Sequence, residues 1–172
     1  IVILGGFLII NTKSLLTNYH RDLLESDNLR VKTILFEITT QIYNISEDLA
    51  FDENIREIIS GKYDVNANRS RELSAFSMIN NYDTNYAEIE SIEVYTDNPE
   101  FVDYKQFHRA DETVQNTEWF KRALSQTSVF WVPMISKDSY GNEYWNFCLV
   151  RKIPLVNSDY NAVLVIKISD NY

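Results

Sequence analysis

Residues 7–60 contain neither proline nor glycine, and this uninterrupted stretch limits the possible folds more than any other feature. Within it, between residues 14 and 49, apolar side chains recur every three or four positions, with one gap at Ser26-Asp27. That spacing predicts an amphipathic α-helix, which at 1.5 Å per residue would be a rod of roughly 50 Å. The apolar positions are Leu15, Tyr19, Leu23, Val31, Ile34, Ile38, Ile42, Ile45 and Leu49.

We expect residues 13–50 to form this membrane-proximal helix and its two halves to pack differently. The second half is expected to lie along its own domain, since its apolar face needs a core to cover it. In the first half the repeat is close to heptad spacing, so pairing with a second copy is also open. The predicted assembly is therefore a homodimer formed through residues 13–50.

The first ten residues carry no charged side chain, and the chain begins with Ile1 rather than methionine. Ten residues are too few to cross a hydrocarbon core, which needs about 20. We expect residues 1–12 to be the outer end of a transmembrane helix that begins before residue 1. A signal-peptide core and a buried core segment are the alternatives, although residues 11–14 offer no small-x-small cleavage site.

Composition excludes several classes of function. The net charge of −9 and the pI near 4.7 argue against nucleic acid as a partner, because such binding depends on clustered Lys and Arg. One cysteine excludes an intrachain disulfide, and two histidines provide little for a metal centre. No nucleotide-binding loop, zinc-protease motif or nucleophile elbow occurs. We therefore expect no cofactor, no metal and no catalytic residues in this chain.

Beyond the long helix, the pattern predicts two short helices and then a region rich in strands. Asp52 is a candidate N-cap for a helix that ends at Ser60-Gly61, and residues 62–70 read as a polar connection. A further helix is expected over residues 71–82. The inner face of that helix is predicted to consist of Leu73, Phe76 and Ile79.

The second half of the chain alternates strand and turn signals. A strand is expected from Ile89 to a turn at Asp97-Asn98-Pro99, a weaker one over 101–107, and a helix opening at Thr117. Strands over 129–135, 143–153 and 162–168 follow, joined by short turns, as in an antiparallel meander. The predicted fold class is α+β: a long N-terminal helix, then an antiparallel sheet with flanking helices, residues 51–172 forming the domain.

This order of elements resembles the PAS-like extracellular sensor domains of the Cache type. Short stretches support the resemblance, and the order and spacing of elements carry most of its weight. Taken with the apolar start, the chain most resembles the ectodomain of YesM-like sensor histidine kinases. The stretches are residues 92–98 (IEVYTDN), 118–123 (EWFKRA), 129–132 (VFWV), 149–153 (LVRKI) and 162–168 (AVLVIKI).

The resemblance implies a receptor held in the cell membrane by one helix before this domain and another after it. The domain would face the extracellular side, and the ATP-dependent kinase part would lie in the cytoplasm, outside this chain. The implied partners are a small-molecule ligand or an extracellular solute-binding protein. The alternatives are the same ectodomain on a transcription regulator, chemoreceptor or cyclase, or a secreted binding protein or enzyme.

The candidate ligand-binding residues are aromatic side chains and one arginine. On a strand Arg151 shares a face with Trp145, Phe147, Leu149 and Ile153, and a guanidinium among apolar neighbours needs a partner. That partner is either internal, such as Asp103 or Asp111, or a ligand carboxylate. Core filling is the alternative role for the tryptophans. The candidates are Trp119, Trp131, Arg151, Tyr95, Trp145 and Tyr144.

Cache domains that bind amino acids have an arginine two residues before the helix tryptophan, where this chain has Thr117. Tyr144 and Asp170 are the possible counterparts of a tyrosine and an aspartate on their later strands. The absent arginine argues against an amino acid as the ligand.

Overall fold

The computed structural model describes residues 2–60, 65–137, 140–156 and 158–169, with side chains described from residue 21 onward except for residues 65–70. The chain divides into two units, residues 1–40 and residues 41–172. Helix α1 (Val2–Phe51) belongs to both, because it is continuous across the boundary. The prediction of a long helix without a break at Ser26-Asp27 is confirmed.

In the first unit every described side chain from residue 21 to residue 37 is exposed. Several of them are apolar, so this part of α1 carries apolar surface that no described residue covers. They are Leu23, Leu24, Leu29, Val31, Ile34, Leu35 and Phe36. No helix of the described residues is both long and apolar enough to cross a membrane.

The second unit is built around a five-stranded sheet in the order β2-β1-β5-β4-β3. Its strands are β1 (Ile89–Thr96), β2 (Phe107–Arg109), β3 (Phe130–Lys137), β4 (Glu143–Ile153) and β5 (Ala162–Ile168). The β3-β4-β5 meander and the α+β class are confirmed, and β4 and β5 have the predicted bounds. The sheet is mixed rather than wholly antiparallel, because β1 and β2 run parallel.

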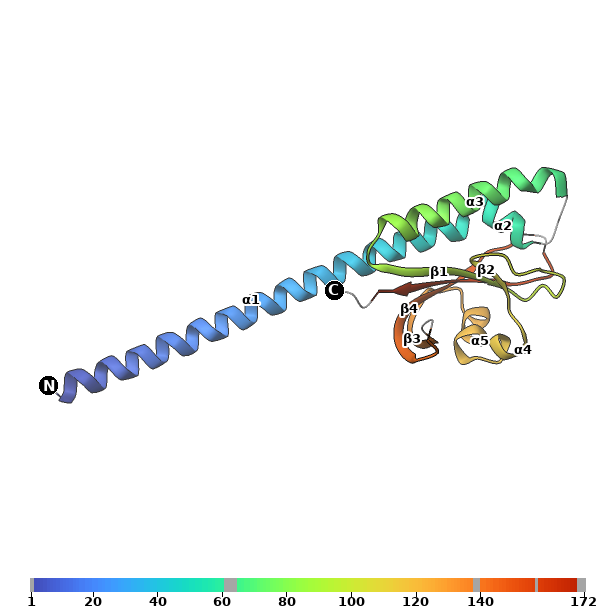
Figure 1. Cartoon of the computed structure of the whole chain (residues 1–172). Coiled ribbons are helices and arrows are strands. Elements are labelled where there is room, and N and C mark those ends of the chain that lie inside the picture. The colour runs from blue at the N-terminus through green and yellow to red at the C-terminus, as the bar shows by residue number, and fades with distance from the viewer. Residues whose placement is uncertain (1, 61–64, 138–139, 157, 170–172) are drawn as a thin grey trace. The chain divides into compact units, whose positions relative to one another are not determined.

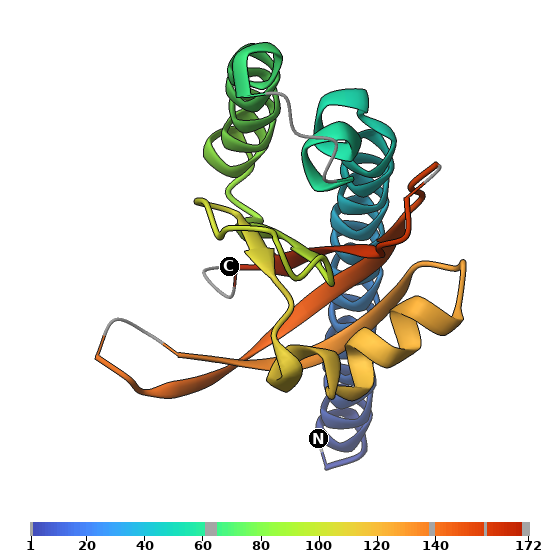
Figure 2. The ribbon, with the colours of Figure 1, turned by 90° about the vertical axis from the view of Figure 1, so that its right-hand side faces the viewer.

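Helices cover both faces of the sheet (Figures 1 and 2). One face, here called the α1 side, carries the end of α1, α2 (Glu53–Ile59) and α3 (Val65–Asn85). The other, the α5 side, carries α4 (Glu112–Gln115) and α5 (Glu118–Ser125). β5 lies in the middle, and its residues 162–166 are buried on both faces, as expected for a central strand covered twice.

Side-chain caps position the short helices. Asp52 accepts a hydrogen bond from the Ile55 amide at 2.9 Å, which confirms it as the N-cap of α2. Thr117 caps α5 as predicted, through a 3.4 Å bond from the Phe120 amide. Asp111 caps α4, a helix that the sequence did not predict. Gly61, the expected end of α2, lies outside the described residues.

Three local predictions are wrong. α3 begins at Val65, so residues 65–70 are helical rather than a polar connection. Leu73 is 67% exposed, because the buried stripe of α3 runs instead through Ala75, Phe76 and Ile79. The strand expected over residues 101–107 shrinks to β2, since Lys105 adopts a left-handed φ of 51° in a tight turn between Tyr104 and Phe107.

Candidate ligand-binding site

The two faces of the sheet divide the predicted site residues, because neighbouring residues of a strand point to opposite faces. Arg151 lies on the α1 side, where its Nε donates to the Ser46 hydroxyl of α1. Cys148 and Val150 face the other way and pack with Trp119 and Phe120 on the α5 side. The cross-strand pairs Trp131–Leu149 and Ile135–Trp145 put both tryptophans on the face of Arg151. The candidate ligand-binding residues Trp119, Trp131 and Arg151 therefore do not lie on one face of the sheet.

An open groove of about 770 Å³ lies on the α5 side. Its floor is formed by strands β1, β3, β4 and β5, and its wall by α4 and the start of α5. It brings together three of the predicted residues, Tyr95, Trp119 and Tyr144, and is bordered by a fourth, Trp145, which is 66% exposed. The other lining side chains include Glu90, Glu93, Met134, Ser136, Val165 and Lys167.

A charged pair lies on the floor of this groove. Lys167 of β5 donates to Glu93 of β1 at 2.7 Å, and the Tyr95 hydroxyl donates to the second carboxylate oxygen at 2.7 Å. Burial by itself would raise the pKa of Glu93, but the charge of Lys167 and the two hydrogen bonds outweigh it and lower that pKa below its usual range. Burial, together with the neighbouring Glu93 carboxylate, raises the pKa of Tyr95. Glu93 is therefore ionised and Tyr95 neutral at physiological pH.

A second carboxylate at the groove accepts neutral donors. Glu90 accepts hydrogen bonds from the Tyr144 hydroxyl, at 2.5 Å, and from the side-chain amide of Asn146. Asn146 is only 3% exposed, and its Oδ1 is buried with no hydrogen-bond partner among the described residues. Glu90 is exposed and has no cationic partner among the described side chains. This end of the groove is consequently a place where an additional donor would be stabilised.

The aromatic part of the groove is held by ring contacts. Tyr95 meets Trp119 at 5.5 Å between ring centroids and His108 at 5.4 Å, and Trp119 meets Phe120 at 5.5 Å. Phe120 is buried in the core, whereas Trp119 is half-buried and packs against that core. Trp119 thus fills core volume on one side and borders the groove on the other, so the two roles expected of it are combined.

On the α1 side, Arg151 has different partners from those predicted. Its Nε donates to Ser46 Oγ at 2.9 Å and its guanidinium lies 4.7 Å from the centre of the Tyr43 ring. Asp103 and Asp111 are engaged elsewhere, since each accepts a hydrogen bond from a backbone amide. Nη2 of Arg151 is buried with no hydrogen-bond partner among the described residues. Arg151 therefore joins β4 to α1 through a hydroxyl and a ring rather than through an ion pair.

The remaining two predicted tryptophans form an aromatic surface on the α1 side of β3 and β4. Trp131 stacks on Phe147, with 5.3 Å between centroids and 8° between planes. Phe147 and Trp145 are largely exposed, and so is Ile135 opposite Trp145. Figure 2 shows this β3–β4 hairpin reaching beyond the helices, which explains why these side chains are uncovered.

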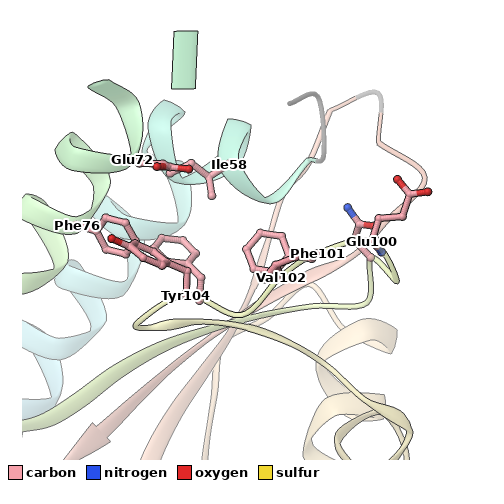
Figure 3. A pocket seen from close by; sticks show the side chains of 9 residues that line it. Ile58, Glu72, Phe76, Glu100, Phe101, Val102 and Tyr104 are labelled. Carbon is pink, nitrogen blue, oxygen red and sulfur yellow. Dashed lines mark hydrogen bonds between the residues drawn. The ribbon is translucent and has the colours of Figure 1, made fainter. Parts of the chain in front are cut away.

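A second, smaller cavity lies between α2, α3 and the connection from β1 to β2 (Figure 3). Its volume is about 350 Å³, and none of its lining residues was a predicted site residue. The one available signal was the set of aromatic residues at 101, 104 and 107, which the sequence placed on a strand. The cavity is lined by Ile58, Glu72, Phe76, Asn98, Glu100, Phe101, Val102, Tyr104 and Phe107.

Among the described side chains, no group of three or more His, Cys, Asp or Glu residues comes together as a metal site would require. Cys148 is fully buried, and burial raises the pKa of its thiol to about 12, so it is protonated at neutral pH. Asp170, a possible counterpart of a Cache ligand-binding aspartate, lies outside the described residues.

In comparisons with known proteins, no family model matches the chain and no curated protein sequence is significantly similar to it. The similarity to Cache-type sensor domains and to YesM-like kinases thus stays a prediction.

Proposed function

We propose that this chain is the extracellular sensing domain of a membrane-bound receptor, and more specifically of a two-component sensor histidine kinase. The ligand binds in the groove on the α5 side. The observation that carries the proposal is the floor of that groove, where Lys167, Glu93 and Tyr95 form a closed polar network beside the ring of Trp119. A few oriented polar groups among aromatic and apolar walls are typical of small-molecule sites.

The dimensions of the groove support this proposal. Its volume of about 770 Å³ falls within the range of pockets that hold drug-sized ligands. Its polar groups include two carboxylates, of Glu90 and Glu93, and two ammonium groups, of Lys137 and Lys167, so a ligand with both donors and acceptors would find partners. Glu90 at one end and Trp119 at the other favour a ligand with a donor-bearing polar end and an apolar body.

A route for the signal runs through the strands to α1. β5 contributes Lys167 to the groove, while the adjacent β4 contributes Arg151 to the contact with Ser46 on α1. Because β4 and β5 are paired from Cys148–Lys167 to Ile153–Ala162, a ligand that moves one strand also moves the other. Ligand binding would thereby shift the population between two positions of α1, which continues toward the membrane in this proposal.

A solute-binding protein is the alternative ligand, and the aromatic surface at Trp131, Trp145 and Phe147 favours it. Trp and Phe side chains are enriched in the centres of protein–protein interfaces. This surface lies on the same face as Arg151, so a docked protein could act on α1 by the same contact. In that arrangement the groove on the α5 side would not be required for the response.

Reading the gene on both sides of the 172 residues tests the receptor itself. We expect an apolar run that includes residues 1–12 and a second run of about 20 apolar residues shortly after Tyr172. A histidine-kinase output module should follow the second run. A stop codon directly after Tyr172 would contradict the receptor.

Variants of the full-length receptor in membrane vesicles test the site. We expect Trp119→Ala and Arg151→Ala to change the rate of phosphorylation from ATP, because one opens the groove and the other disconnects β4 from α1. Val156→Ala, on an exposed turn, is the matched control and should behave like the wild type. Wild-type phosphorylation in both site variants would show that the groove is not the sensing site, and a response lost only in Phe147→Ala, on the aromatic surface outside the groove lining, would favour the binding protein.

A further inference from the structure

The cavity between α2, α3 and the β1–β2 connection has the walls of a small-molecule site. Figure 3 shows Phe76 and Tyr104 side by side at one end, Phe101 in the middle, Glu100 at the other end, and Ile58 with Glu72 above them. Most of these walls are apolar, and the volume of about 350 Å³ is at the lower limit for ligand pockets. A molecule of one ring with a short substituent is the size that fits.

The aromatic wall is braced by its own contacts. Phe76 meets the ring of Tyr104 at 4.7 Å and the ring of Phe107 at 5.3 Å, both edge to face. Phe76 and Phe107 are buried, and each is anchored in a regular element, α3 and β2. The cavity is therefore held open by packed rings, and closing it would require these contacts to break.

One polar group in the lining has an unused donor. Asn98 is 4% exposed, its backbone amide donates to Thr96 Oγ1, and its Oδ1 accepts from the Glu100 amide at 3.0 Å. Its backbone carbonyl accepts from the Phe101 amide. Its side-chain amide nitrogen has no acceptor among the described residues. Because Asn98 lines the cavity, this donor is available to an acceptor oxygen of a bound molecule.

The charged side chains of the lining indicate which ligand charge the cavity would accept. Among the described lining residues, the two charged side chains, Glu72 and Glu100, are both acidic. The nearby ammonium of Lys105 lies over the rings of Phe76 and Tyr104 and is not among the described lining residues. An anion in the cavity would therefore lie beside the carboxylate of Glu100, so a carboxylate or phosphate ligand is disfavoured.

We propose that this cavity is a second binding site, for a small neutral molecule with a mainly apolar, one-ring body and one acceptor oxygen directed at Asn98. The site is distinct from the groove, because it lies on the α1 side of the sheet and the groove lies on the α5 side. Binding there would stabilise α2 and α3 against the β1–β2 connection.

Three probes of nearly equal size test the site: acetophenone, ethylbenzene and benzoate. With the 172-residue chain, calorimetry and saturation-transfer NMR should detect saturable binding of acetophenone. Ethylbenzene, which lacks the acceptor, should bind about tenfold more weakly, as expected for one hydrogen bond. Benzoate should not bind. Equal affinity for acetophenone and ethylbenzene, or binding of benzoate, would overturn the assignment of Asn98 and the charge argument.

Two variants and one control locate the binding. Asn98→Asp keeps an oxygen that accepts from the Glu100 amide but loses the side-chain donor. The affinity for acetophenone should therefore fall to that for ethylbenzene. Val102→Trp fills the mouth from a position that is 80% exposed, where a ring is tolerated, and should abolish binding of both. Val156→Trp, at an exposed position outside the cavity lining, should leave both affinities unchanged. Acetophenone binding that survives Val102→Trp with an unchanged melting temperature, or no saturable binding to the wild type, would overturn the proposal.

Discussion

The same strands form both faces of the sheet, but the two faces differ in the side chains they carry. On the α1 side the residues of β4 and β5 that meet the helices are apolar and almost fully buried, and Arg151 is the one charged side chain among them. On the α5 side the same strands contribute Lys167 and Asn146 to a polar network that borders an open groove. A one-residue step along a strand thus separates a face packed by α1, α2 and α3 from a face that carries an open groove beside its own core.

We expect substitutions of buried residues on either face to destabilise the fold, and substitutions of exposed residues to cost little.

Leu149→Ala should be the most damaging single change, because Leu149 is fully buried on the α1 side of the central part of β4. We expect a loss of about 3 kcal/mol in the free energy of unfolding, from the lost transfer energy and the cavity left behind. Phe147→Ala, two residues earlier on the same face but 49% exposed, is the matched control and should cost about 1 kcal/mol or less. Urea unfolding measures both, and equal losses would contradict the burial contrast along β4.

Lys167→Met should cost about 2 kcal/mol in the free energy of unfolding, since it leaves the mostly buried Glu93 carboxylate without its cation. The double variant Lys167→Met/Glu93→Gln should recover most of that loss, because no uncompensated charge remains. The two single variants and the double variant form a thermodynamic cycle in urea unfolding. Strict additivity of the two single effects would show that the pair is not coupled.

The lowered pKa of Glu93 predicts a dependence of stability on pH. A carboxyl group whose pKa is lower in the folded state stabilises the fold above its ordinary pKa of 4.5, and that contribution is lost as the pH falls toward the folded value. The gap in unfolding free energy between the wild type and Glu93→Gln should therefore be largest at neutral pH. It should narrow in acid, and a gap that stays constant would contradict the shift.

The smallest expected effect is at Cys148, whose thiol should not react measurably with an alkylating reagent while the protein is folded. Its thiol is buried beside the core of the α5 side and its pKa is raised to about 12, so the reactive thiolate is both rare and inaccessible. Alkylation by iodoacetamide at neutral pH should be negligible until urea unfolds the chain. Rapid alkylation of the folded protein would mean that this face opens more readily than its packing indicates.

The sequence predicted regular elements better than it predicted their connections. The turns at residues 139–142 and 154–160 marked the bounds of β4 and the start of β5, and the capping residues Asp52 and Thr117 marked helix starts, because these signals are local. The prediction of a strand over 101–107 was wrong because Lys105 adopts a left-handed conformation. Glycine is the usual sequence signal for that conformation, and there is none near Lys105. The first turns of α3 were missed because polar residues there resemble a connection.

The candidate site was predicted in part. Alternation correctly grouped Arg151 with Trp145, Phe147, Leu149 and Ile153 on one face. It could not say that Trp119 would pack on the opposite face, since that depends on where α5 returns to the sheet. The partner of Arg151 is Ser46, 105 residues earlier in the chain, and no local pattern indicates a contact at that separation.

In the proposed mechanism, ligand binding in the groove on the α5 side changes α1 on the other side of the sheet. This can be tested with a tethered surrogate: Ser136→Cys lies in the groove lining and can carry a pyrenyl maleimide, while the buried Cys148 stays unlabelled. Labelling at Ser128→Cys, outside the groove lining, is the control. The measurement is deuterium exchange of the backbone amides of residues 42–51 of α1.

We predict that the label at residue 136 changes exchange in residues 42–51, that the label at residue 128 does not, and that Ser46→Val removes the effect by disconnecting Arg151. Unchanged exchange in residues 42–51 with the groove occupied would contradict communication between the two faces.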